Sequence, residues 1–188
     1  MQNISDIRNN NNTRVLFENL IRPHLDSLYR LAYRFTGTTT DAEDLLQDLL
    51  VKIYPKVTEL AEIDKLHPWL ARVLYRMFID NKRRYARSPI RLVSDDNIIQ
   101  DYDTTMDNIA SHAPMPDEET ESKIRNRQLK HAITCLNTDQ RILLSFHDME
   151  GYTLNELQAI LDCPIGTLKS RLHRARARLR ELLEQGTL

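Results

Sequence analysis

Glycine, cysteine and long apolar segments are scarce in this sequence, and each shortage excludes a class of protein. Only four of the 188 residues are glycine, and Leu, Ala, Arg and Glu dominate its periodic segments. This composition favours helices over sheets. No apolar run approaches the roughly 20 residues that span a bilayer, so we expect no membrane insertion.

Metal-binding and catalytic patterns are also missing. The two cysteines, Cys135 and Cys163, lack the spacing of a metal site, and we expect both to be reduced and partly buried. The six histidines do not pair with cysteines or carboxylates at ligand spacing, and no phosphate-binding loop or nucleophile motif occurs. We therefore expect no enzymatic activity, no metal and no cofactor.

The N-terminal residues 1–13 are polar and rich in asparagine. They lack the apolar core of a secretory signal, so we interpret them as a disordered leader of a cytoplasmic protein.

Charge is unevenly distributed, although the net charge is only −1. Two basic blocks, 72–91 with seven basic residues and 167–182 with six, each contain a single acid. Between them, residues 94–121 hold nine acids and neither Lys nor Arg. Two separated basic blocks are typical of a protein that contacts a polyanion in two places.

Hydrophobic periodicity predicts an all-α protein of two small helical domains. In the first domain, residues 14–91, we expect helices over about 14–35, from Thr40 to Pro55, and from Pro68 to about Arg84. Thr40 with Glu43 would form a capping box, and Pro55 would end the second helix. The acidic, aperiodic residues 92–119 indicate a flexible linker. Helical signals resume in the second domain, residues 120–186.

The most specific pattern lies in the second domain. Thr153 and Glu156 form a capping box before a short apolar helix, and Asp162-Cys-Pro then makes a turn into a longer helix. Two helices joined by such a turn predict a helix-turn-helix.

The second helix of this motif can be drawn at roughly 100° per residue. Leu168, Leu172, Ala175 and Leu179 then form an inner apolar stripe. The residues opposite this stripe form an outer ridge that would reach base edges. The basic residues on either side of the ridge would contact phosphates. A solvated amphipathic helix is the simpler interpretation, but it does not explain the capped helix and turn. The predicted DNA-binding residues are Thr167, Lys169, Ser170, Arg171, His173, Arg174, Arg176 and Arg178.

This second domain resembles region four of extracytoplasmic-function sigma factors. The resemblance lies in Leu136-Asn-Thr-Asp-Gln-Arg-Ile-Leu-Leu, Gly151-Tyr-Thr-Leu-Asn-Glu-Leu and Gly166-Thr-Leu-Lys-Ser-Arg-Leu-His-Arg-Ala-Arg. It implies that the helix-turn-helix reads the minus-thirty-five element of a promoter. Three residues depart from the family pattern: Asn137 replaces a proline, Gln158 a small residue and Asp162 a glycine.

The first domain contains Asp41-Ala-Glu-Asp-Leu-Leu-Gln-Asp, which is similar to the family's region two. In that family this segment docks on core RNA polymerase, at the clamp of the largest subunit. Four acids and no base suit a basic partner surface, although acids also favour any helix N-terminus. The polymerase-binding residues implied by the resemblance are Asp41, Glu43, Asp44, Gln47 and Asp48.

The segment from His67-Pro-Trp to Lys82-Arg-Arg resembles the helix that handles the melted minus-ten element. Trp69, Val73 and Met77 would form one apolar stripe, widened by Leu70 and Leu74. A basic face with an aromatic ring suits single-stranded DNA, although a charged helix exit would look similar. The predicted DNA-binding residues are Arg72, Tyr75, Arg76, Lys82 and Arg83. Residues 57–66 match the family's base-selecting loop but are acidic here.

The resemblance implies an alternative sigma factor for stress-responsive transcription, with core polymerase, promoter DNA and an anti-sigma factor as partners. The alternative is a helix-turn-helix regulator that acts without polymerase, but it has no use for the acidic motif at Asp41 or the helix containing Trp69.

Overall fold

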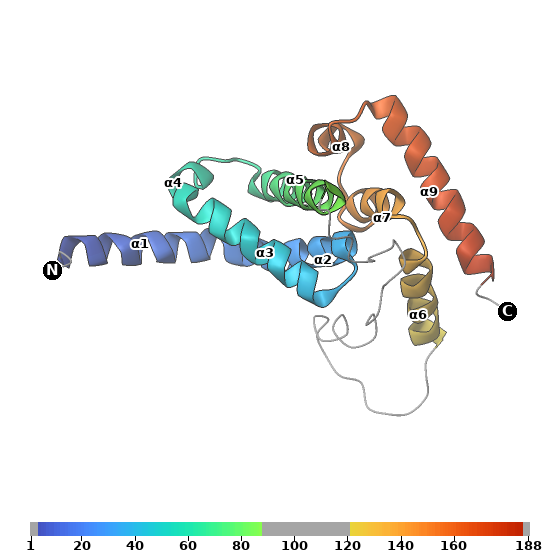
Figure 1. The fold of residues 1–188 in the computed structure, drawn as a ribbon, viewed down its shortest axis with the longest axis horizontal. Coiled ribbons are helices and arrows are strands. Elements are labelled where there is room, and N and C mark those ends of the chain that lie inside the picture. Colours follow the sequence, from blue (N-terminus) through green and yellow to red (C-terminus); the bar gives the residue numbers. More distant parts are fainter. Residues whose placement is uncertain (1–3, 88–120, 186–188) are drawn as a thin grey trace.

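The computed structural model describes residues 4–87 and 121–185, and every regular element in these two ranges is helical (Figure 1). The predicted all-α fold is therefore confirmed. The predicted linker, residues 92–119, lies outside the described residues.

The N-terminal domain contains five α-helices and two short 3-10 turns. Their bounds are α1 (Ile4–Ile21), η1 (Arg22–His24), α2 (Leu25–Thr36), α3 (Thr39–Ile53), η2 (Tyr54–Lys56), α4 (Val57–Leu60) and α5 (Leu66–Arg87). Pro55 lies in η2, directly after α3, as predicted.

The predicted helix over 14–35 is wrong in two respects. It is divided at η1, where Pro23 removes a backbone donor and cannot continue the helical ladder. Helix α1 also begins at Ile4, within the segment interpreted as a disordered leader. Phe17, Leu20 and Ile21 pack against the core and nucleate α1, and a nucleated helix extends through polar residues at small cost.

Helix α3 has its N-cap two residues earlier than predicted. Its N-cap is Thr38, whose hydroxyl accepts a hydrogen bond from the Asp41 backbone N–H. Thr38-x-x-Asp41 and Thr40-x-x-Glu43 overlap in the sequence. The first is used because Gly37 ends α2 in the left-handed conformation, at φ 86°, immediately before it.

The core of this domain lies between α2, α3 and α5, where Leu31, Leu49 and Leu74 are fully buried. Leu70, Ala71 and Leu74 are the buried residues of α5, whereas Trp69, Val73 and Met77 are only partly buried. Leu70 and Leu74, which we expected to widen this apolar stripe, are therefore among its most deeply buried members.

The C-terminal domain contains α6 (Glu121–Thr134), α7 (Thr138–Leu144), the π-helical turn η3 (Ser145–Met149), α8 (Leu154–Leu161) and α9 (Ile165–Gln185). The predicted capping box of Thr153 and Glu156 is present at the start of α8. Asn137 and Gln140 form a second capping box at α7. Asn137 thus starts a helix at the position where the family has a proline.

Helix α8 and the turn after it accommodate the two remaining departures from the family pattern. Asp162 adopts the left-handed conformation at φ 51°, which Asp tolerates better than most residues. Gln158 is exposed, while its neighbour Leu157 is fully buried. The helix packing that Gln158 could disturb is therefore made by other residues.

The two domains pack directly on each other. Helix α8 lies against α5, and α7 lies against α2 (Figure 1). Buried residues of both domains belong to one continuous hydrophobic cluster. The predicted linker, residues 92–119, is therefore not the only connection between the two domains.

Candidate nucleic-acid and polymerase interfaces

Helix α3 presents its acidic residues to solvent. Ala42, Leu45, Leu49 and Ile53 anchor the opposite side of the helix in the core. Asp41, Glu43, Asp44, Gln47 and Asp48 are all exposed. Val51 continues the Asp44–Asp48 face by one turn and is 74% exposed, an apolar residue that the sequence did not single out.

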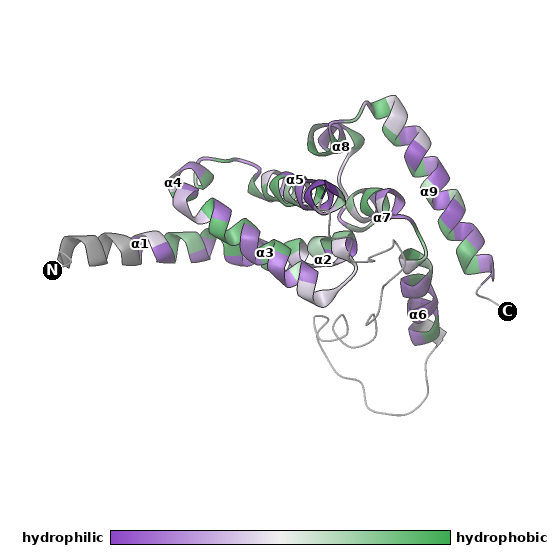
Figure 2. Ribbon diagram, in the orientation of Figure 1, coloured by the Kyte–Doolittle hydropathy of each residue, from purple (hydrophilic) through white to green (hydrophobic). Residues whose placement is uncertain are grey.

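Helix α9 is oriented as its periodicity predicts. Leu168, Leu172 and Ala175 are buried on the inner side, and Leu179 is half-buried. Hydrophilic and hydrophobic residues alternate along the ribbon in Figure 2. The outer-ridge residues Ser170, His173 and Arg174 are exposed, as are Lys169, Arg171, Arg176 and Arg178; Thr167 is half-buried.

Two of the flanking arginines already have partners within the domain. Arg176 Nε donates to Asp148 Oδ2 at 3.0 Å, and Arg178 NH1 donates to Glu181 Oε2 at 2.9 Å. The hydrogen bond from Arg176 holds the pKa of Asp148 below its usual value. Arg176 therefore braces α9 against η3, a role that sequence spacing did not predict.

The predicted DNA-binding residues of α5 divide into two groups. Arg76, Lys82 and Arg83 are exposed, but Arg72 and Tyr75 are half-buried. The Tyr75 ring makes T-shaped contacts with two phenylalanines, with centroids 6.1 Å from Phe35 and 6.3 Å from Phe146 of the other domain. Burial raises the pKa of the Tyr75 hydroxyl. Arg72 and Tyr75 are thus less exposed than the rest of the predicted basic face, and Phe146 of the C-terminal domain contributes to the burial of Tyr75.

A polar groove lies between the two helices, α5 and α9, that carry the predicted DNA-binding residues. It is lined by Tyr75 and Lys82 of α5, by Arg171 and Arg174 of α9, and by Asp139 of α7, among others. The structure thus brings residues of both predicted DNA-binding sets around one groove.

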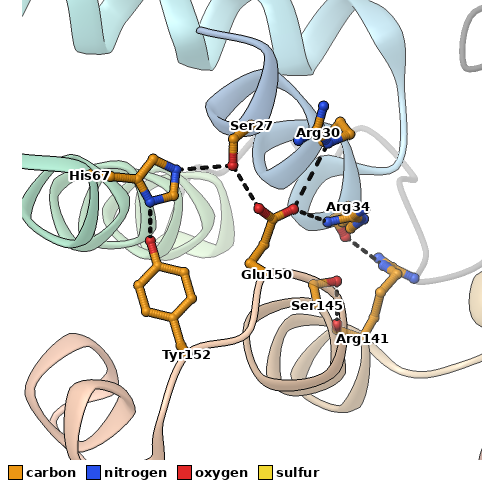
Figure 3. A network of polar contacts seen from close by, with 8 residues as sticks. All are labelled: Ser27, Arg30, Arg34, His67, Arg141, Ser145, Glu150 and Tyr152. Atoms are coloured by element: carbon orange, nitrogen blue, oxygen red, sulfur yellow. Dashed lines mark hydrogen bonds and ion pairs between the residues drawn. The ribbon is translucent and has the colours of Figure 1, made fainter. Parts of the chain in front are cut away.

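A largely buried carboxylate links the two domains (Figure 3). Glu150, which follows η3, accepts hydrogen bonds from Ser27 Oγ at 2.6 Å and from Arg34 NH1 at 2.7 Å, both on α2. Arg141 of α7 donates from Nε to the main-chain oxygen of Arg34 at 2.6 Å. The side chains of Arg34 and Glu150 are only 13% and 10% exposed.

His67 extends this network to α5. Its Nε2 lies 2.9 Å from Ser27 Oγ, and its Nδ1 lies 2.6 Å from the Tyr152 hydroxyl. Ser27 donates its one hydrogen to Glu150, so its oxygen must accept from His67. With Nε2–H donating to Ser27, a neutral His67 accepts the Tyr152 hydroxyl hydrogen at Nδ1, and burial, which lowers the pKa of His67, favours this neutral form.

Acid should weaken this network. Burial and the nearby His24 lower the pKa of His67, and Arg30 adds to this, while Glu150 opposes it. The stabilisation from neutral His67 is then complete above about pH 6.5, its ordinary pKa, and is lost as the pH falls through the lower value of the folded protein. Urea unfolding between about pH 8 and pH 5 measures this loss. His67→Gln should flatten the pH dependence, and His131→Gln, at an exposed site, should leave it unchanged.

Neither a metal nor a membrane site is apparent among the residues that the structure describes. No group of three His, Cys, Asp or Glu side chains there could hold a metal ion. None of the described helices is sufficiently long and apolar to cross a bilayer. Both cysteines are free thiols; Cys163 is half-buried as expected, but Cys135 is exposed because it follows α6 at the surface.

Both helical domains match known families. A model of Sigma-70 region 2 matches residues 20–88, and a model of Sigma-70, region 4 matches residues 126–179. The ECF RNA polymerase sigma factor SigE of Mycolicibacterium smegmatis is 32% identical over 167 residues. The chain belongs to the extracytoplasmic-function sigma factors. The N-terminal domain of this sigma factor is region 2, and its C-terminal domain is region 4.

The relatives differ in how much of their length is matched. The aligned part covers 89% of this chain but only 61% of SigE from M. smegmatis. The ECF sigma factor SigW of Bacillus subtilis is 25% identical, with 89% of this chain and 88% of that protein covered.

Two solved structures have a similar fold. One is the sigma factor RpoE in complex with the anti-sigma factor NepR from Bartonella quintana, with 27% identity and a TM-score of 0.64. That match covers 89% of this chain and 96% of RpoE, so it includes both domains. CnrH in complex with the cytosolic domain of CnrY has 19% identity and a TM-score of 0.56, covering 90% of this chain and 88% of CnrH.

Proposed function

We propose that this sigma factor binds core RNA polymerase in the cytoplasm and directs it to specific promoters. One observation carries the proposal: a single chain combines an exposed acidic face on α3, inside region 2, with a helix-turn-helix whose outer ridge is exposed, inside region 4. A regulator that acts without polymerase needs only the second of these features.

In this proposal region 2 binds polymerase and melted DNA, and region 4 binds duplex DNA. Asp41, Glu43, Asp44, Gln47 and Asp48 dock on the clamp of the largest polymerase subunit, where their charge suits a basic surface. Region 2 melts and reads the minus-ten element through α5, and region 4 reads the duplex of the minus-thirty-five element through α9. Arg76, Lys82 and Arg83 are exposed for this purpose, whereas Arg72 and Tyr75 are half-buried.

An anti-sigma factor is a further proposed partner. The RpoE structure from B. quintana was solved with the anti-sigma factor NepR, and its fold matches this chain across both regions. We expect an anti-sigma factor to bind this chain as well and to keep it from core polymerase.

In vitro transcription tests the function directly. Purified sigma factor and core polymerase are combined with a library of genomic promoter fragments, and transcript start sites are sequenced. Promoter-specific starts that need both components are the expected result. A helix-turn-helix regulator would instead bind duplex DNA equally well with and without core polymerase, and would add no new start sites.

Substitutions on α9 should distinguish residues that recognise base pairs from residues that bind phosphates. Arg174 lies on the outer ridge, so Arg174→Ala should relax preference at one or two base pairs of the upstream element, by about 1–3 kcal/mol. Lys169 lies on a flank, so Lys169→Ala should weaken every promoter alike and lower the salt dependence by about one unit of slope. Promoter-library transcription at two salt concentrations distinguishes them. The opposite assignment of effects would mean that α9 enters the groove with a different face.

A further inference from the structure

Helix α9 carries two arginines that are paired with acids, and the two pairs differ in where the acid lies. Arg178 pairs with Glu181 inside α9, and the two side chains are 44% and 56% exposed. An exposed pair at this spacing moves with the helix and should contribute little. Arg176 instead bonds to Asp148 of η3, outside the helix-turn-helix. The Arg176 pair therefore fixes a side chain of α9 to a second element.

The contact between Arg176 and Asp148 has two hydrogen bonds. Arg176 Nε donates to Oδ2 of the carboxylate and NH2 donates to Oδ1. Two parallel bonds of this kind fix the plane of a guanidinium group as well as its position. They use one of the five guanidinium N–H groups on Nε and one on NH2. The two N–H groups of NH1 lie on the other side of the guanidinium, where they can bind a second acceptor.

His147 holds the same carboxylate in place. Its Nδ1 lies 2.9 Å from Asp148 Oδ1. The hydrogen bond from Arg176 lowers the pKa of Asp148 most, burial opposes this and His147 adds to it, so Asp148 is ionised at neutral pH. An ionised carboxylate only accepts hydrogen bonds, so His147 Nδ1 carries the hydrogen and donates it. Asp148 is thus held by His147 while it holds Arg176.

The backbone that carries Asp148 is itself anchored. The Glu150 N–H donates to the Ser145 oxygen at 3.0 Å and closes the π-helical turn around Asp148. Phe146, two positions before Asp148, is fully buried. Helix α7, which leads into this turn, packs against α9. A side chain held by a neighbour and mounted on an anchored turn is a suitable support for a ligand-binding group.

We propose that Asp148 is a positioning residue for promoter binding: it holds Arg176 so that NH1 donates to a phosphate of the minus-thirty-five duplex. The proposal rests on the proposed function, because it takes α9 to be the helix that enters this duplex. Lys169 lies on the same side of α9, about two turns before Arg176, so both face the same phosphate backbone. An arginine that is already ordered loses less conformational freedom when it binds.

Removing the charge of Asp148 should weaken promoter binding. Asp148→Asn keeps the shape of the side chain but leaves Arg176 free to rotate, so the affinity of the holoenzyme for a promoter fragment should fall on the order of three- to tenfold. If Asp148 only neutralised Arg176, the same substitution would strengthen binding, because DNA is a polyanion. Filter binding or fluorescence anisotropy with holoenzyme, repeated at several salt concentrations, measures both the affinity and its salt dependence.

The loss should depend on Arg176. In the Arg176→Ala background, Asp148→Asn should cause no further loss, because no arginine remains to be positioned. Arg176→Ala alone should lower the salt dependence by about one unit of slope, as Lys169→Ala should. Glu181→Gln makes the matched change from acid to amide in the pair within α9 and should alter affinity less than about twofold. Circular dichroism establishes that each variant is folded.

Three results would overturn the proposal while leaving the sigma-factor function intact. They are a gain or no change in affinity on Asp148→Asn, a loss that persists in the Arg176→Ala background, and an unchanged salt dependence of Arg176→Ala beside a lowered one of Lys169→Ala. In the last case the Arg176 pair would only join α9 to η3, and urea unfolding would show lost stability alone. Unchanged salt dependence of both variants would also contradict the proposed entry of α9 into the duplex.

Discussion

Asp48→Arg should abolish transcription because the chain no longer binds core polymerase. Asp48 lies on the exposed acidic face of α3, one turn after Asp44. A reversed charge removes an attraction and adds a repulsion against a basic partner surface, which costs several kcal/mol when the interface is closely packed. Co-purification with core polymerase should fall to background, and Asp44→Arg should act alike.

The control for this result is an exposed acid elsewhere in the same region. Asp26 is exposed in the first turn of α2 and is not one of the acids of α3. Asp26→Arg introduces the same change of charge and should retain polymerase binding. Because Asp44 and Asp48 pack against nothing in the core, circular dichroism should show both α3 variants to be folded. Normal co-purification of the two α3 variants would remove the clamp assignment.

The features that the sequence predicted depend on local patterns. Side chains at helical spacing place Leu168, Leu172 and Ala175 on the inner side of α9, and a capping box needs only four consecutive residues, as at Thr153. Asp162 could be assigned a left-handed turn because its own side chain tolerates it. Such features are determined by residues within a few positions of one another.

The features that the sequence did not predict depend on residues far apart in the chain. Glu150 and Arg34 are 116 positions apart, and no periodicity connects them. The half-buried state of Tyr75 follows from the same domain contact, so its face looked solvent-exposed when α5 was considered alone. The division of the first helix at Pro23 is different, because a proline acts locally and the sequence alone is enough to predict its effect.

Region 4 depends on Leu157 for its stability more than on any polar residue beside it. Leu157 is fully buried in α8, a helix that packs against both α5 and α9. Leu157→Ala removes apolar contacts and leaves a cavity, so the free energy of unfolding should fall by about 2–5 kcal/mol. Urea unfolding followed by circular dichroism measures the loss, and recognition of the minus-thirty-five element should weaken with it.

Gln158→Ala is the matched control, one position along the same helix. Gln158 is exposed, and a surface substitution without a buried partner usually changes stability by less than about 0.5 kcal/mol. A small residue is also what the family carries at this position, so the variant tests whether Gln158 weakens the helix-turn-helix. A gain well above that range on Gln158→Ala would show that the glutamine strains the α8–α9 packing. Equal losses from both variants would mean that α8 is not anchored through Leu157.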